Sequence, residues 1–189
     1  GLTRSTSGIF YIGENFRIIK YDPNTNYVGS IAGKPGVNSN SNGFGRDGTF
    51  GEMFTIVVDP AEKFIYSTHA YQCIVKKTNL LTQETTTVVG LSGACGTTSG
   101  FLGTNRIYSE ALTMDRFGNL WITGNNYVFF AANTPSGFYS EVIGGTGAAS
   151  SIDNVVSTSA TICSARGIVV AQSGDVFVTD NFNHKVRRF

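Results

Sequence analysis

A repeat of about 56 residues restricts the possible folds of this sequence more than any other feature. Phe64, Leu120 and Val176 stand at an interval of 56 residues, and Phe10 precedes Phe64 by 54. Each begins an apolar run after a polar turn, and a third run that mixes Ile or Val with Lys or Arg generally follows. A fixed period of this kind indicates that one supersecondary unit is repeated along the chain.

The repeated unit has the pattern of β-strands. Its runs alternate apolar and polar residues, as in "GDVFVTD", and no stretch has the periodicity of a long helix. The 23 glycines among 189 residues, with only 14% charged residues, favour many tight turns. Four antiparallel strands repeated at a fixed period are typical of a β-propeller blade. We therefore predict an all-β protein, a β-propeller built of four-stranded antiparallel blades.

The predicted propeller is incomplete. We expect a single domain over residues 1–189, with repeats at about 1–33, 54–90, 111–144 and 167–189. The first and last repeats each supply three runs and the two middle ones four, which makes about three and a half blades. The first lacks its inner strand and the last its outer strand. Closed propellers have about four to eight blades, so we expect either part of a longer propeller or completion by neighbouring copies.

The last repeat resembles the NHL repeat. Asp180, Asn183, His184, Lys185 and Val186 stand where that family has an Asp turn followed by Asn-His-Arg-Ile, with Lys185 in place of the usual Arg. The resemblance implies a propeller fold and a structural role in the turn for Asp180, Asn183 and His184.

Two repeats depart from the family pattern. The second has Thr68 and Gln72 at the positions expected for Asp and His, and the third has Gly124 where the Asp turn would begin. The fold prediction therefore rests on the period, and the family resemblance on the last repeat.

The sequence predicts neither a catalytic nor a metal site. Some NHL-like enzymes bind zinc through a cluster of histidines, whereas this chain has only His69 and His184. Cys73 follows His69 by four residues without a third, orienting group. The glycine-rich segment around Asp47 lacks the following helix of a phosphate loop and the several carboxylates of a calcium loop. We expect no cofactor.

Three cysteines are compatible with one disulfide and one free thiol. Cys73, Cys95 and Cys163 should all approach the same face of the propeller. Cys73 with Cys95 is the favoured pair, and Cys95 with Cys163 is the rival. A disulfide, together with many Asn, Ser, Thr and Gly residues, favours an extracellular or cell-surface location.

Charge and hydropathy exclude two classes of partner. A net charge of +1 does not suit a nucleic-acid binder, and Lys or Arg on the third strands is typical of edges protected against pairing. The chain contains no uninterrupted apolar stretch of about 18 residues, the length that a membrane-spanning segment needs.

We therefore expect a non-catalytic interaction or structural module that presents propeller surfaces for protein–protein assembly. Its partner would be other copies of itself or the rest of a longer chain, and a carbohydrate is possible. The inner strands beginning at Thr55, Ala111 and Gly167 offer little for chemistry. The predicted assembly edge is the last strand: Lys185, Val186, Arg187, Arg188 and Phe189. The alternative is part of an NHL-like enzyme or carbohydrate-binding propeller whose axial site lies partly outside this chain.

Overall fold

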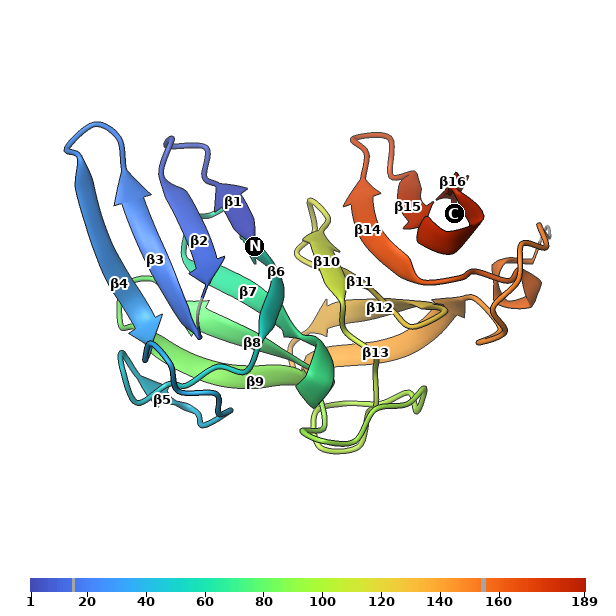
Figure 1. Cartoon of the computed structure of the whole chain (residues 1–189), viewed down its shortest axis with the longest axis horizontal. Helices are drawn as coiled ribbons and strands as arrows, with labels where there is room; N and C mark the ends of the chain where they lie inside the picture. Colours follow the sequence, from blue (N-terminus) through green and yellow to red (C-terminus); the bar gives the residue numbers. More distant parts are fainter. Residues whose placement is uncertain (15, 154–155) are drawn as a thin grey trace.

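The computed structural model of the protein describes residues 1–14, 16–153 and 156–189, which form an arc of four antiparallel sheets (Figure 1). In Figure 1 the arc runs from the N-terminal sheet on the left, through two sheets below, to the C-terminal sheet on the right. The first and last sheets stand apart at the top of the view. The prediction of an all-β propeller is confirmed, because each sheet is a blade.

Each blade is a meander in which strands that follow one another in sequence are hydrogen-bonded neighbours. Blade 1 contains β1 (Leu2–Arg4), β2 (Phe10–Glu14), β3 (Arg17–Asp22) and β4 (Tyr27–Gly33). Blade 2 contains β6 (Met53–Val58), β7 (Phe64–His69), β8 (Ile74–Asn79) and β9 (Glu84–Gly90), with β5 (Gly43–Phe44) added beyond β9. Blade 3 contains β10 (Ala111–Met114), β11 (Leu120–Gly124), β12 (Tyr127–Thr134) and β13 (Gly137–Gly144). Blade 4 contains β14 (Ala165–Val170), β15 (Val176–Asp180) and β16 (Lys185–Arg188). Short 3₁₀ turns lie at η1 (Ala70–Gln72), η2 (Ser157–Ser159) and η3 (Asn181–Asn183).

The strand count differs from the prediction in two places. Blade 1 does have an inner strand, β1, which pairs Leu2 with Ile12 and Arg4 with Phe10. Three residues are too few to show an alternating pattern in sequence. The two-residue strand β5, in the glycine-rich linker, was likewise not predicted. Within the described residues blade 4 has three strands, as predicted, and β16 is its edge.

The repeat register also needs a correction. Ile65, Leu120 and Val176 are the equivalent residues, because each pairs at the same place on the following strand and each is buried. The 56-residue interval predicted Phe64 at this position instead. The turn after β6 closes between Asp59 and Phe64 and is one residue longer than the corresponding turns of blades 3 and 4. The interval between the second and third repeats is therefore one residue shorter than predicted.

This shift changes the residues that occupy the repeat turn of blade 2. Thr68 and Gln72 do not take the Asp and His positions. The residue that follows the 3₁₀ turn has left-handed backbone in both blades, with φ 57° at Cys73 and φ 52° at His184. The equivalent pairs are His69 with Asp180, Cys73 with His184, and Lys76 with Arg187.

Apolar side chains fill the contacts between successive blades. Ile18 of blade 1 packs in one cluster with Ile56 of blade 2, and Val75 of blade 2 shares a cluster with Leu112 of blade 3. Val128 of blade 3 lies in a third cluster with the buried valines of β15. The hydrophobic core therefore lies between the sheets.

The linkers between blades hold the outer edge of the blade that follows. The linker before blade 2 contributes β5, which pairs with β9, the outermost meander strand of that blade. The linker before blade 3 contributes Gly100, which exchanges two 2.9 Å backbone hydrogen bonds with Ser140 of β13. No helix in the described part of the chain is long and apolar enough to cross a membrane.

Candidate functional site

Polar groups near the N-terminal ends of the inner strands form hydrogen bonds within the fold. The Thr68 hydroxyl donates to the backbone oxygen of Glu110 at 3.2 Å, and the Glu110 carboxylate accepts from the backbone N–H of Asn125 at 3.2 Å. No three His, Cys, Asp or Glu side chains within residues 1–14, 16–153 and 156–189 are placed to hold a metal ion together.

The two histidines have different environments. His184 lies on an exposed turn, whereas His69 is fully buried and its ring stacks on Phe50 with centroids 5.6 Å apart. The Nδ1 atom of His69 lies 3.3 Å from the Gly51 carbonyl and Nε2 lies 2.9 Å from the Ser67 hydroxyl. Burial, and then the charge of nearby Lys76, lowers the pKa of His69 to about 3. His69 is therefore a neutral core residue.

Lys76 is also fully buried and fastens the linker to blade 2. Its Nζ donates to the carbonyls of Ser41 and Thr49 at 2.8 and 2.9 Å. Burial lowers the pKa of Lys76 to about 8.

The repeat-turn residues of blade 4 form a buried network around Asp180. Its carboxylate accepts hydrogen bonds from Arg187 Nε at 2.6 Å, from the Asn183 amide at 2.8 Å and from the Cys163 backbone at 2.9 Å. Burial would raise the pKa of Asp180, but these hydrogen bonds outweigh burial and lower it. His184 contributes its left-handed backbone. The network joins the turn to β16 and to the preceding linker.

A disulfide joins Cys73 to Cys95, the favoured pair, and Cys163 is a free, half-buried thiol. The bridge connects the turn before β8 to the linker that leaves blade 2.

The predicted assembly edge is only partly exposed. Lys185, Val186 and Arg188 are exposed, but Arg187 is buried against Asp180. Phe189 exchanges backbone hydrogen bonds with Val176 and packs into the core between blades 3 and 4. Alternation places Val186 and Arg188 on the face opposite Arg187 and Phe189. Lys185 shares the face of Arg187 and is exposed at the start of the strand.

The face of blade 4 that points away from blade 3 is an open, mainly apolar surface, which we call the C-flank: Val169, Phe177, Thr179, Val186 and Arg188. Val186 is 69% exposed, whereas the equivalent Ile18, Val75 and Val128 are completely buried against the next blade. The C-flank is therefore a blade-packing face without a blade on it among the described residues.

Blade 1 presents the opposite kind of face, which we call the N-flank: Leu2, Phe10, Ile12, Tyr21 and Val28. Leu2 and Val28 are each 65% exposed. Its residues occupy the face that, in blade 4, packs on blade 3.

A groove of about 800 Å³ runs beside β16. It lies between that strand and linker residues Asp153, Ser157 and Ala160, and the linker is held by Arg187, which bonds Asp153 and lies 3.5 Å from the Ser151 hydroxyl. Lys76 holds the linker of blade 2 from the equivalent position. The groove is where an outer strand would extend the sheet.

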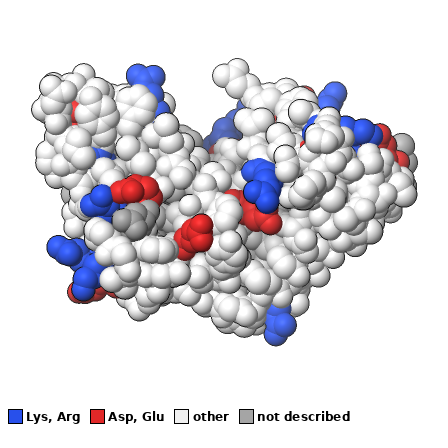
Figure 2. Space-filling view, in the orientation of Figure 1, with Lys and Arg blue, Asp and Glu red and all other residues white. Residues whose placement is uncertain are grey.

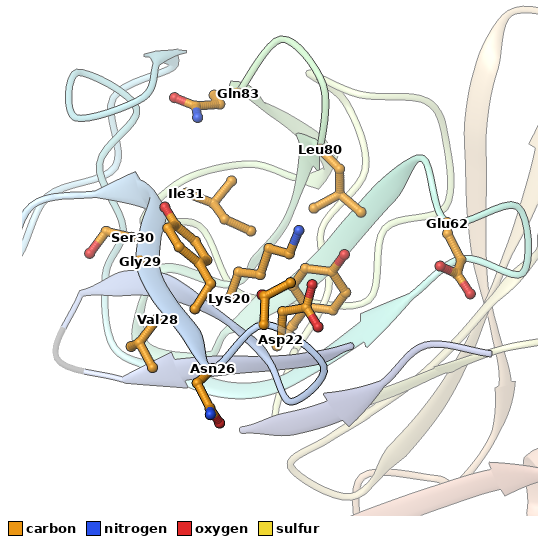
Figure 3. A pocket seen from close by; sticks show the side chains of 13 residues that line it. Lys20, Asp22, Asn26, Val28, Gly29, Ser30, Ile31, Glu62, Leu80 and Gln83 are labelled. Carbon is orange, nitrogen blue, oxygen red and sulfur yellow. The ribbon is translucent and has the colours of Figure 1, made fainter. Parts of the chain in front are cut away.

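A second groove lies between the outer half of blade 1 and two turns of blade 2 (Figure 3). Figure 3 shows Lys20 and Asp22 pointing into the space between β4 and Leu80. None of its lining residues was predicted from the sequence as a site residue. Figure 2 shows charged side chains scattered over a largely uncharged face.

Comparison with known proteins agrees with this geometry. The NHL repeat family model matches residues 163–189, which span the Asp180 network and β16. The chain is a β-propeller with an NHL repeat. No curated protein sequence matches it.

Solved structures similar to this NHL-repeat propeller include three bacterial proteins. An auxiliary nutrient binding protein from Bacteroides thetaiotaomicron has a TM-score of 0.72 at 15% identity, over 97% of this chain and 45% of that one. The extracellular domain of a one-component system from the same organism has a TM-score of 0.60 at 12% identity, over 100% and 21%. Virginiamycin B lyase from Staphylococcus aureus has a TM-score of 0.57 at 14% identity, over 100% and 54%. These identities show the fold alone, and the chain spans about half or less of each structure's length.

Proposed function

We propose that this NHL-repeat propeller is a non-catalytic extracellular module that assembles with a second copy of itself, the C-flank of one copy packing on the N-flank of the other. One observation carries the proposal. Val186 is largely exposed, although its equivalents in the other three blades are completely buried by the blade that follows.

The two flanks are complementary by construction. In every contact between successive blades, the face that carries Val186 or its equivalent packs on the face that carries Ile12 or its equivalent. The face with Val186 is open on blade 4, and the face with Ile12 is open on blade 1. A second copy can therefore repeat the packing already used three times within the chain. Such a head-to-tail contact closes into a ring or continues as a filament, depending on the rotation between copies.

Burial of apolar surface favours the contact. Exposed apolar patches of this kind commonly mark association sites. The groove beside β16 extends the same surface and offers the backbone groups of an edge strand.

The disulfide between Cys73 and Cys95 supports an extracellular location, since such bonds persist in oxidising compartments. The extracellular domain and the nutrient-binding protein among the similar structures agree with a binding role outside the cell. The polar groups at the starts of the inner strands already form hydrogen bonds within the fold, which supports a role without catalysis.

The oligomeric state of the purified 189-residue chain tests the proposal. Light scattering after size exclusion should show a dimer or larger oligomer whose population rises with concentration. Val186→Asp places a charge in the C-flank and should give monomers. Leu81→Asp, on an exposed turn outside both flanks, is the matched control and should leave the oligomer intact. A wild-type monomer at every concentration, or an oligomer that survives Val186→Asp, would contradict the proposal.

A further inference from the structure

The groove between blades 1 and 2 has the size and position of a ligand site. It measures about 900 Å³, near the upper end of the usual range of about 300–1,000 Å³. Tyr11, Lys20 and Asp22 of the groove lie on the face of blade 1 that points toward blade 2, opposite the N-flank, and Val28 of the N-flank lines its edge. The groove therefore adjoins the N-flank but is remote from the C-flank.

The floor of the groove contains a buried phenol with an unused hydroxyl. Tyr11 is only 5% exposed, and its hydroxyl has no hydrogen-bond partner in the described part of the chain. Burial, and then the charges of Glu62 and Asp22, raises the pKa of Tyr11, so the hydroxyl remains a donor. It is available to a group that enters the groove.

One wall of the groove is an aromatic ring. Tyr27 is 54% exposed, and its side chain lies over Gly29, where a Cβ would collide with the Tyr27 hydroxyl. The glycine thus allows the ring to lie along β4. An exposed aromatic face suits the apolar C–H face of a pyranose ring.

The rim supplies polar groups with spare hydrogen-bonding capacity. One Asp22 oxygen accepts from the Asn24 backbone at 2.9 Å, which leaves the other oxygen available. Within the described residues, Lys20, Asn26 and Gln83 form no side-chain hydrogen bond or ion pair, and all three line the groove. Carboxylate and amide groups can each bond two neighbouring hydroxyls.

The charge of the lining selects the class of ligand. Lys20 is the single cation among the lining residues, and a phosphate generally needs several charged donors. The Glu62 carboxylate is already bonded by Thr6 and Ser7. We infer that this groove binds a neutral oligosaccharide, with Tyr27 as the stacking platform, Tyr11 as a donor from the floor and Asp22 as an acceptor at the rim.

Calorimetric titration with a panel of neutral hexasaccharides tests the inference. The probes are cellohexaose, xylohexaose, mannohexaose and maltohexaose, with hexagalacturonate as an anionic comparison. At least one neutral probe should bind. Tyr27→Ala should weaken it at least tenfold, and Tyr11→Phe, which removes only the hydroxyl, about fivefold.

The controls separate this site from the rest of the surface. Tyr71→Ala removes an exposed tyrosine of the 3₁₀ turn in blade 2 and should leave the affinity unchanged. Val186→Asp should also bind normally, so failure of the assembly proposal would not affect this one. Circular dichroism verifies that each variant is folded. The inference is overturned if no neutral probe binds at millimolar concentration, if only the anionic probe binds, or if both groove variants retain full affinity.

Discussion

His69 should make the stability of the propeller depend on pH between 7 and 5. The buried ring is neutral in the folded state, with a pKa of about 3, and in the unfolded chain its pKa returns to about 6.5. Below pH 6.5 the unfolded state therefore binds a proton that the folded state does not, and stability falls as the pH falls. Proton linkage with these two values gives a loss of about 2 kcal/mol between pH 7 and pH 5.

Other titrating groups contribute little in this window. Lys76, with a pKa of about 8, is protonated throughout most of it. The pKa of Glu62 is lowered to about 2, chiefly by hydrogen bonds from Ser7 and Thr6, so its effect on stability lies mostly below pH 5. The change in stability between pH 7 and pH 5 therefore reports mainly on the buried ring of His69.

Urea unfolding at pH 7 and pH 5 measures this term. His69→Gln removes the titrating ring and should abolish the loss of about 2 kcal/mol, although it lowers stability at both pH values because the ring is fully buried. His184→Gln changes the exposed histidine and should keep the wild-type pH response. The reasoning is wrong if His69→Gln retains the full response, or if wild-type stability is equal at the two pH values.

Two further changes test the supports of the repeat turns. Reduction of the Cys73–Cys95 bond, which spans 22 residues, should lower the free energy of unfolding by about 3 kcal/mol, measured by thermal unfolding with and without reductant. Cys163→Ser removes the free thiol and should behave as wild type. An unchanged unfolding midpoint on reduction would count against the bond. Asp180→Ala leaves a buried arginine without its buried partner and should cost about 3–5 kcal/mol in urea unfolding, against less than about 1 kcal/mol for Asp153→Ala, whose side chain is 79% exposed. Equal effects of the two would contradict this account.

The sequence was sufficient to predict the propeller because strand alternation and repeat length are local properties. The same locality explains the errors. Nothing in the sequence marks the extra residue in the turn before Phe64, so the second repeat was aligned one residue out and His69 was not recognised as the counterpart of Asp180. The three residues of β1 gain strand geometry only by pairing with β2.

The site residues show a similar division. Asp180 and Asn183 were predicted because the NHL resemblance names them, and the favoured cysteines meet because both lie near one blade. The groove between blades 1 and 2 was missed because Tyr27 and Gln83 are brought together only by the packing of the two blades. The polar turn that ends at Asn26, followed by Tyr27 and then Gly29, is the weak signal that could have indicated it.

The linkers pair with the outer strand of the blade that follows, and this pairing affects the cooperativity of thermal unfolding. Because β5 holds β9, and Gly100 holds β13, loosening one sheet releases backbone groups on its neighbour. The blades are thus not a row of separately melting units, as the modules of a solenoid can be. Heat should unravel all four in a single cooperative transition, with equal calorimetric and van't Hoff enthalpies.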